Sequence, residues 1–348
     1  MLTGTGVLEI LGAEGSEGRA TAVRTTNGIL PADMVVVAVG VKPSVELAKA
    51  AGLALGEKTG AIRVDAHMRT SDPDIYAAGD CVEVRNLITG QPAFVPLGST
   101  ANKQGRVAAN HICGIPDEFP GVLGSSVCKV FDYCVARTGL TEREARAAGY
   151  DTEVAITPAP DRAHYMPQAN VLILKLVADR KTRKLLGAQA VGPGAGDKRI
   201  DVAAMALTAG MTVDQLAHAD LCYAPPYSPA VDNILTAADV MRNKLDGCFA
   251  GVSAQTLRDE LRSERPPFLL DVRTPGEYAQ MRIKGSALIP LGALRERLNE
   301  VPRDRPVVAF CKISLRGYEA ARILQGAGYK DVRVLDGGLI AWPYETEI

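Results

Sequence analysis

The most constraining feature of the sequence is a single cysteine between a strand-like run and a helix-like run. The apolar segment 306–310 predicts a strand, and Tyr318–Leu324 predicts a helix. Cys311 and the loop through Arg316 lie at their junction, where the first backbone N–H groups of the helix have no intrahelical partner. These groups and the helix dipole favour an anion, so a thiol placed there ionises more readily. The pattern predicts a reactive cysteine with Arg316 as a fixed positive charge; the alternative is a small buried residue at a strand end.

Bulk properties restrict the classes of partner. The chain has 348 residues, enough for two or three domains, and its net charge of -1 gives no reason to expect nucleic acid or an acidic membrane surface. It contains no apolar run of about 18 residues, and its first residues lack the features of a signal peptide. The seven cysteines are scattered without a CxxC pair, and with four histidines no metal-site spacing occurs. We therefore expect a reduced, cytoplasmic protein without a metal site.

The first part of the chain alternates short strand-like pieces with turns. Residues 6–11 and 21–25 predict strands around a Gly/Glu-rich turn, and Asn27-Gly28 is a hairpin signal. Asp33–Gly40 predicts a continuous apolar strand of the parallel kind that is covered on both faces. Val45–Ala51 then predicts a short helix, and Gly60–Asp65 a further strand.

A glycine-aspartate pair carries the first family resemblance. The run Thr70–Asp80, which ends in Ala-Ala-Gly-Asp, resembles the second flavin fingerprint of the two-dinucleotide-binding-domain oxidoreductases. That resemblance implies that Asp80 hydrogen-bonds the ribityl chain of FAD beside Gly79. The chemistry is sensible, because a carboxylate accepts bonds from sugar hydroxyls and a glycine permits close approach. The alternative is a surface turn capped by Asp80.

A second segment extends the same resemblance. Pro96, Leu97, Ser99 and Ala101 lead into a helix expected over Lys103–Cys113, with Ser99 or Thr100 as its N-cap. In the resembled family this helix directs its N-terminus at the electron-rich edge of the flavin, which implies that these residues border the cofactor. The alternative is an ordinary capped helix.

The middle of the chain, 119–247, resembles the dimerisation domain of the disulfide-reductase branch. Strands are expected over Val127–Arg137, Val171–Val177 and Leu185–Val191, and helices over Arg199–Gly210 and Asp214–Ala219. The run 221–228 is similar to the tyrosine-bearing segment of coenzyme A-disulfide reductases. This implies that Tyr223 or Tyr227 reaches across a homodimer to the active cysteine of the partner. The alternative is a rigid, proline-rich loop with packed aromatic residues.

A related segment departs from that family. Where the coenzyme A-disulfide reductases usually have two adjacent tyrosines before a proline, this chain has Tyr165 and Met166 before Pro167. The departure puts part of the inherited tyrosine site in doubt.

The last part, 252–348, resembles a rhodanese over its whole length. The matching runs are Asp271–Tyr278, the loop Cys311–Arg316, and Leu335–Gly338. The resemblance implies that Cys311 is the nucleophile that carries sulfur as a persulfide, stabilised by Arg316 and the loop amides. Ser314 stands where many rhodaneses have glycine, which costs the loop freedom if a positive φ is needed. A second departure is Arg282, which falls near a histidine position common in the family.

The spacing of the loop distinguishes two chemistries. Cysteine phosphatases use the same strand–loop–helix design with five residues between the cysteine and the arginine. Four residues separate Cys311 from Arg316. A smaller ring of amides suits a terminal sulfur better than a phosphoryl group, so the loop predicts sulfur transfer.

Together these features predict a multidomain α/β and α+β chain. We expect 1–43 to end an NAD(P)-binding domain, 44–118 to return to an FAD-binding domain, 119–247 to dimerise and 252–348 to form a rhodanese. The resemblance implies an FAD- and NAD(P)H-dependent reductase of coenzyme A disulfide, persulfide or polysulfide, fused to a sulfurtransferase that could use thiosulfate. No GxGxxG is present, so we expect the front of the reductase to be missing and FAD to bind poorly. The alternative is a sulfurtransferase or sulfur carrier on a non-catalytic dimer scaffold.

Overall fold

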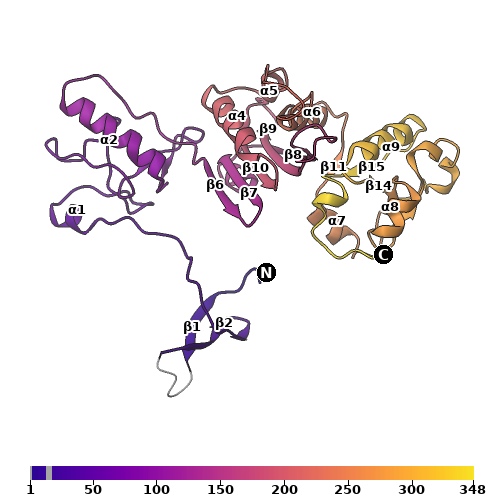
Figure 1. Cartoon of the computed structure of the whole chain (residues 1–348), viewed down its shortest axis with the longest axis horizontal. Helices are drawn as coiled ribbons and strands as arrows, with labels where there is room; N and C mark the ends of the chain where they lie inside the picture. The colour runs from indigo at the N-terminus through magenta and orange to yellow at the C-terminus, as the bar shows by residue number, and fades with distance from the viewer. Residues whose placement is uncertain (1, 13–17) are drawn as a thin grey trace. The chain divides into compact units, whose positions relative to one another are not determined.

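The computed structural model describes residues 2–12 and 18–348, which divide into two compact units, Met1–Val45 and Glu46–Ile348. The first unit contains an antiparallel meander in the order β1-β2-β3 (Figure 1). Its strands are β1 (Val7–Gly12), β2 (Ala20–Thr25) and β3 (Gly28–Pro31). The hairpin expected at Asn27-Gly28 is confirmed, because Thr25 pairs with Gly28. The expected Gly/Glu-rich turn falls mainly on 13–17, outside the described residues.

The apolar run 33–40 does not form the predicted strand. No described residue pairs with it, and Val36 and Val39 are 80% and 90% exposed. A strand exists only through hydrogen bonds to a neighbour. The composition of 33–40 is suited to burial in a sheet. Among the described residues, however, the segment has no strand partner and most of its valine side chains are exposed.

The second unit begins with α1 (Glu46–Ala50), close to the predicted helix, and continues through a largely irregular segment. Its regular elements are β4 (Val84–Arg85), β5 (Pro92–Ala93) and α2 (Gly98–Ile112). Gly60–Asp65 is not the predicted strand: Ile62 forms isolated bridges with Leu55 and Val82 instead. The N-cap prediction is also wrong, because α2 begins five residues early and Leu97 is its N-cap without a side-chain bond.

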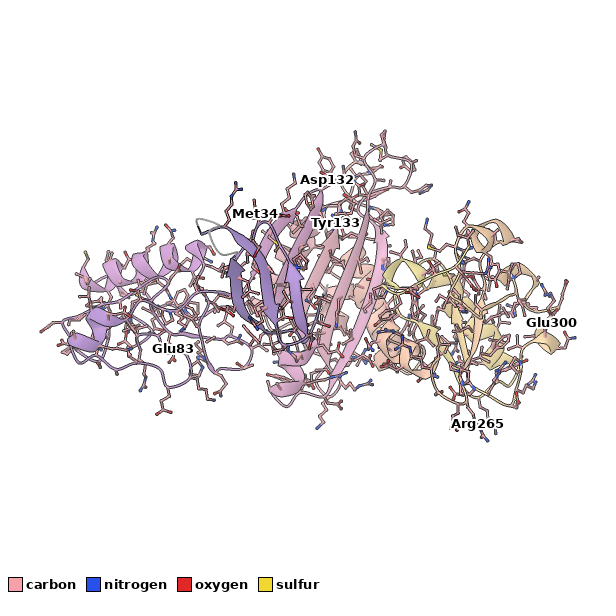
Figure 2. All side chains as sticks on the ribbon, turned by 90° about the horizontal axis from the view of Figure 1, so that it is seen from below. Met34, Glu83, Asp132, Tyr133, Arg265 and Glu300 are labelled. Atoms are coloured by element: carbon pink, nitrogen blue, oxygen red, sulfur yellow. The ribbon has the colours of Figure 1, made fainter. Side chains whose placement is uncertain are left out.

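The next part of the chain forms an antiparallel sheet in the order β6-β7-β10-β9-β8. Its strands are β6 (Ser126–Val130), β7 (Tyr133–Gly139), β8 (Thr152–Pro160), β9 (Val171–Asp179) and β10 (Leu185–Gly192). The strands predicted near β9 and β10 are confirmed. The single strand predicted over Val127–Arg137 is instead a hairpin, because Phe131 turns left-handed at φ 51°. Figure 2 shows Asp132 and Tyr133 at this turn.

Helices cover one face of this sheet. Helix α4 packs on β7 and β10, and α6 on β8 and β9 (Figure 1). The helices of this region are α3 (Glu142–Ala147), α4 (Gly196–Thr208), α5 (Val213–Ala217) and α6 (Asn233–Leu245). Alternate strand residues such as Leu172, Leu174 and Ala190 form the core beneath them. The other face exposes Val127, Val191 and their neighbours around an open groove of about 490 Å³.

The last part of the chain forms a parallel sheet in the order β11-β15-β14-β12-β13. Its strands are β11 (Gly251–Val252), β12 (Phe268–Asp271), β13 (Ala287–Leu288), β14 (Val307–Phe310) and β15 (Val332–Leu335). Its helices are α7 (Ala254–Glu260), α8 (Pro275–Gln280) and α9 (Leu315–Gly326), with short 3-10 turns at Leu291–Ala293, Leu298–Glu300 and Leu339–Ala341. The Ser253 side chain caps α7 by accepting a hydrogen bond from the backbone N–H of Thr256.

No helix among the described residues is long and apolar enough to span a membrane. Nor do the residues outside the gaps contain a group of three His, Cys, Asp or Glu side chains able to hold a metal ion.

Candidate active site

Cys311 lies directly after β14, at the carboxyl end of a central strand. All four residues of β14 are buried, and the strand pairs in parallel with β12 and β15. Cys311 itself is fully buried within the core of this layer. The sulfur is therefore held by a rigid sheet, and the loop that follows decides what can approach it.

The loop turns through Ser314, whose φ of 79° lies in the left-handed region. This conformation costs a residue with a side chain about 1–2 kcal/mol. The Ser314 hydroxyl donates a 2.8 Å hydrogen bond to the carbonyl of Leu335, which offsets part of that cost. The loop thus has the positive φ at Ser314 for which the sequence argument considered serine less favourable than glycine.

Two substitutions separate these effects. Ser314→Ala keeps the strained backbone but loses the hydroxyl, so we expect a loss of about 1 kcal/mol in the free energy of unfolding. Ser314→Gly also loses the bond but relieves the backbone, so its stability should stay close to that of the parent. Denaturant unfolding of both variants measures the difference. Equal losses would contradict a role for backbone strain.

The backbone of the loop offers free donors. Lys312, Ile313 and Ser314 make no hydrogen bond through their N–H groups among the described residues. The first-turn N–H groups of α9, which begins at Leu315, have no intrahelical acceptor. These amides follow Cys311 in the chain at the positive end of a twelve-residue helix. The arrangement is suited to an anionic sulfur species.

Arg316 is fixed by a carboxylate that the sequence analysis did not assign to the site. Its two terminal nitrogens donate to the carboxylate oxygens of Glu277 at 2.8 and 2.7 Å. These bonds are the main reason that the pKa of Glu277 falls to about 2. Hydrogen bonding to Glu277, and then the Cys311 sulfur, raise the pKa of Arg316. The Arg316 guanidinium is therefore held by Glu277, close enough to Cys311 for the sulfur to contribute to its raised pKa.

Glu277 also completes a capping box with Thr274 at the start of α8. The Thr-x-x-Glu spacing signals this box in the sequence, but nothing in that spacing identifies Arg316 as a further partner. Glu277 is thus a positioning residue: one side chain anchors α8 and orients the arginine beside the cysteine.

The pH dependence of this ion pair follows from the lowered pKa of Glu277. A depressed carboxylate pKa gives stability that is full above its unfolded value, near 4.3, and is lost as the pH falls toward about 2. We expect Glu277→Gln to unfold more readily than the parent at pH 7, with the difference shrinking below pH 4. Acid and urea unfolding measure this, with the exposed Glu296→Gln as control. A difference that does not change with pH would contradict the assignment.

A second segment supports the cysteine loop from behind. Leu339 and Ile340 donate backbone bonds of 2.9 and 3.1 Å to the carbonyls of Cys311 and Lys312. Gly338 has no room for a side chain, since a Cβ would lie 2.6 Å from the carbonyl oxygen of Cys311. Any shift of 336–340 would therefore move the loop.

Asp336 fixes this segment to α6. The Nζ of Lys244 donates to Asp336 at 2.7 Å and to the carbonyl of Val154 at 2.6 Å, and both charged side chains are buried. Glu153 lies 3.6 Å from the same ammonium. Burial raises the pKa of Asp336 to about 6, against the attraction of Lys244. The segment that supports the cysteine loop is thus joined to α6 and β8 through the buried Lys244–Asp336 ion pair.

The tyrosines singled out in the sequence face outward. Tyr223 and Tyr227 are 55% and 71% exposed, on the loop between α5 and α6. A backbone bond from Ala163 to Pro225 joins this loop to the segment that carries Tyr165, which is also exposed. The structure brings the three tyrosine-bearing positions onto neighbouring loops. It leaves their phenols accessible.

The residues predicted to border a flavin lie together at the start of α2. Gly79 has a φ of 90°, and its N–H donates a 2.8 Å bond to the side chain of Gln104, which the sequence analysis missed. A Cβ at Gly79 would face Ala101 at 3.7 Å. Asp80 is exposed beside them. Gln104 is fully buried, yet its Nε2 has no partner among the described residues.

These observations fit a bound group that the chain itself does not supply. An orphaned amide nitrogen, a left-handed glycine and an exposed carboxylate meet at a helix N-terminus. Leu97 caps that helix without a side-chain bond, so its first N–H groups remain available. Pro96 is half-buried and Ser99 exposed in the same turn region. The site has the donors and acceptor that one side of a flavin requires.

Three family models match successive parts of the chain. Residues 1–108 match a pyridine nucleotide-disulphide oxidoreductase domain, 125–234 the dimerisation domain of these enzymes, and 253–344 a rhodanese-like domain. The predicted resemblance to pyridine nucleotide-disulphide oxidoreductases and to a rhodanese is thereby confirmed, while the predicted domain boundaries stay a prediction.

Solved structures and curated sequences give the same assignment. An NAD-dependent persulfide reductase from A. fulgidus is 47% identical with a TM-score of 0.89, over 98% of this chain and 61% of that one. The Bacillus anthracis CoADR-RHD is 41% identical with a TM-score of 0.85, over 92% and 57%. A CoA-dependent NAD(P)H sulfur oxidoreductase from Pyrococcus furiosus is 45% identical over 67% of this chain and 52% of its own length. The chain spans about half the length of the curated relatives it matches.

Proposed function

Because the chain joins pyridine nucleotide-disulphide oxidoreductase segments, with their dimerisation domain, to a rhodanese-like domain, we propose that it is a sulfurtransferase coupled to persulfide reduction. Cys311 accepts a sulfane sulfur and passes it to a thiol such as coenzyme A. The resulting persulfide, or a related disulfide or polysulfide, is reduced with NAD(P)H. The observation that carries the proposal is that Cys311 is followed by three backbone N–H groups without partners among the described residues, with Arg316 close enough for the sulfur to raise its pKa.

The first step loads the cysteine. The Cys311 thiolate attacks the outer sulfur of a donor such as thiosulfate, so a new S–S bond forms as the S–S bond of the donor breaks. The electron pair of the broken bond leaves with sulfite. Negative charge then rests on the terminal sulfur of the persulfide, where the loop amides and Arg316 stabilise it. Glu277 holds Arg316 in place through its paired bonds.

The second step unloads it. An acceptor thiolate attacks the terminal sulfur, which regenerates the Cys311 thiolate and leaves the acceptor as a persulfide. Reduction of that persulfide consumes one NAD(P)H and one proton, and it yields the free thiol and hydrogen sulfide. This stoichiometry explains why a sulfurtransferase and a reductase would share one chain.

The reductase half would use the residues at the start of α2. Bound FAD supplies the two-electron transfer between NAD(P)H and a disulfide or persulfide. Asp80 would accept bonds from its sugar hydroxyls, and Gly79 would allow close approach. Gln104 would donate through its unpartnered Nε2, and the turn at Pro96, Leu97, Ser99 and Ala101 would border the ring.

We also propose that the protein functions as a homodimer. The dimerisation-domain match supports this, and the uncovered face of the antiparallel sheet offers an apolar surface of the required kind. Tyr223 and Tyr227 are exposed, as a role in the active site of a second subunit requires. A phenol there could donate to a developing thiolate.

Mass spectrometry tests the proposal directly. Incubation with thiosulfate should add one sulfur atom to the peptide that contains Cys311, and later addition of coenzyme A should remove it. An unmodified Cys311 under these conditions would overturn the proposal. The Cys113 peptide serves as the control, because Cys113 is exposed and lies at the end of α2, outside the site.

A second candidate is sulfur transfer or sulfur storage without reduction. It is favoured by one observation: Cys311, Glu277 and Arg316 all belong to the rhodanese-like domain, so loading needs no other part of the chain. Persulfide on Cys311 without NAD(P)H consumption in the presence of coenzyme A and polysulfide would select this candidate.

A further inference from the structure

A large cavity lies at the end of the rhodanese-like sheet opposite Cys311. It has a volume of about 930 Å³, and Phe268 and Arg305 line it near the first residues of β12 and β14. Cys311 follows the last residue of β14. Because the two strands are parallel and four residues long, about 13 Å of sheet separates the cavity from the cysteine. The cavity is therefore distinct from the sulfur site.

The cavity is lined by cations that lack carboxylate partners. Arg258, Arg262, Lys284 and Arg305 form no ion pair or side-chain hydrogen bond among the described residues. Other arginines of the same domain are paired, for instance Arg333 with Glu260 at 2.8 Å. Unpaired arginines converging on a concave surface form a site for an anion, because each guanidinium can grip a phosphate through two N–H groups.

Aromatic rings line the same space. Trp342 and Tyr344 meet edge to face at 5.0 Å, and the Arg258 guanidinium lies 4.4 Å from the centre of the Tyr344 ring. Arg305 lies 5.4 Å from the centre of the Phe268 ring. Leu269 and Ile283 add buried apolar surface. A planar, apolar group can therefore stack in the cavity next to its cations.

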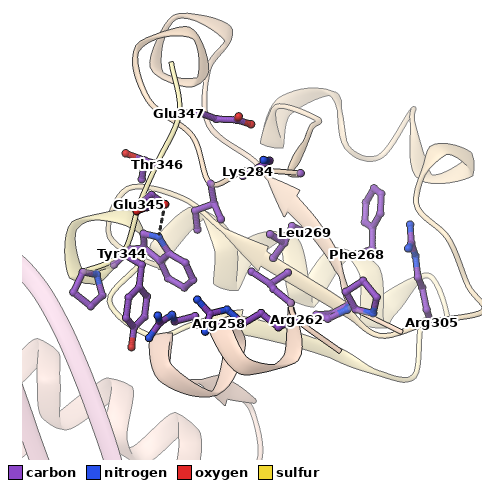
Figure 3. Close-up of a pocket in the computed structure, with 17 residues that line it drawn as sticks. Arg258, Arg262, Phe268, Leu269, Lys284, Arg305, Tyr344, Glu345, Thr346 and Glu347 are labelled. Carbon is purple, nitrogen blue, oxygen red and sulfur yellow. Dashed lines mark hydrogen bonds between the residues drawn. The ribbon is translucent and has the colours of Figure 1, made fainter. Parts of the chain in front are cut away.

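The wall formed by the end of the chain is tied down. Arg282 and Glu347 exchange backbone bonds of 2.8 and 3.0 Å, and the Tyr344 hydroxyl donates to Gln255 at 2.6 Å. Figure 3 shows Arg258 and Arg262 on one side of the cavity, and Lys284 and Glu347 on the other. The lining carries four cations and two carboxylates, Glu345 and Glu347, a net of two positive charges.

From these features we propose that the cavity binds a nucleotide with two or more phosphates. The base stacks on Trp342, whose ring is nearly perpendicular to that of Tyr344, the phosphates meet Arg258, Arg262 and Arg305, and the carboxylate side suits sugar hydroxyls. The volume is that of a site for a ligand of this size. Two sources share this chemistry: a free nucleoside diphosphate, and the phosphorylated adenosine end of coenzyme A.

The test uses the full chain and its only tryptophan, Trp342. ADP should quench the tryptophan fluorescence saturably, and calorimetry should give the same dissociation constant. Adenosine alone and pyrophosphate alone should each bind at least about tenfold more weakly than ADP. Titration with coenzyme A distinguishes the sources: tighter binding than ADP assigns the site to coenzyme A, and weaker or equal binding assigns it to the free nucleotide.

Matched arginine variants locate the site. Arg258→Ala and Arg262→Ala should each weaken ADP binding by about tenfold to a hundredfold. Arg295→Ala, an exposed arginine outside the cavity, should leave it unchanged. Thiosulfate sulfurtransfer by each variant reports that the domain is folded, since neither arginine contacts the cysteine loop. Absence of heat and quenching with ADP, pyrophosphate binding as tight as ADP, or an equal loss in Arg295→Ala would each overturn the proposal.

Discussion

Replacement of Cys311 by serine should reduce thiosulfate-dependent sulfur transfer to background, a fall on the order of 10³-fold or more. A serine hydroxyl is not ionised near neutral pH, and its oxygen cannot carry the sulfur as a persulfide. The side chain is buried, and serine is smaller than the cysteine that it replaces and enters the same space without a clash, so the fold should persist. The measurement is the initial rate of sulfite release with cyanide or coenzyme A as acceptor.

The control for this result is Cys113→Ser. It removes a thiol that is exposed at the end of α2 and remote in the chain from the cysteine loop. Its rate should equal that of the parent, and the far-ultraviolet circular dichroism of both variants should be unchanged. If Cys311→Ser retained more than a few per cent of the parental rate, the persulfide mechanism would be refuted.

Replacement of Lys244 by methionine should cost about 3–5 kcal/mol of stability, the largest loss expected from a single side chain away from the cysteine. The substitution leaves Asp336 buried without its cation and frees the carbonyl of Val154. Because 336–340 supports the cysteine loop, sulfur transfer should fall in the same variant. Thermal unfolding monitored by circular dichroism, together with the rate assay, measures both effects.

The pH dependence identifies the carboxylate responsible. The pKa of Asp336 is about 6 in the folded protein and near 3.9 in the unfolded chain. Between these two pH values the folded protein therefore binds a proton that the unfolded chain has lost. Its contribution to stability is therefore present at low pH and is lost as the pH rises through about 6. Removal of Lys244 raises this pKa further, so Lys244→Met should lose much more at pH 8 than at pH 5. The carboxylate of Glu153, which lies 3.6 Å from the Lys244 ammonium, also raises the pKa of Asp336.

A double variant provides the control. Lys244→Met combined with Asp336→Asn removes both charges, and it should recover part of the lost stability at pH 8 because no unpaired ion remains buried. If the double variant were less stable than Lys244→Met, the buried charge would not be the cause of the loss.

The cysteine loop was predictable because its chemistry is local. The strand before Cys311, the spacing to Arg316 and the helix after it are consecutive in the chain, so the pattern alone predicts an amide-lined anion site. The dinucleotide-type turn at Gly79-Asp80 is local in the same way. The positive φ of Ser314 follows from the same short loop.

The errors share one cause. The run 33–40 has the composition of a buried strand, but no described neighbour pairs with it. The N-cap of α2 falls at Leu97 rather than Ser99 because backbone geometry, and not a side-chain oxygen, begins the helix. In both places the local amino-acid preference is the expected one for the predicted element, but it does not reveal which group the segment pairs with in the folded chain.

The sequence by itself determined the strand, the Cys311 loop and the helix that follows it, together with the order of the parts, because each rests on residues within a few positions of one another. Only the tertiary structure decided that Glu277 orients Arg316 from 39 residues away, and that Lys244 pairs with Asp336 across 92 residues. It also gathered, around one cavity, three aromatic side chains and four cations that have no ion pair among the residues the structure describes. Periodicity encodes which face of an element is buried, but it does not encode which side chain that face meets.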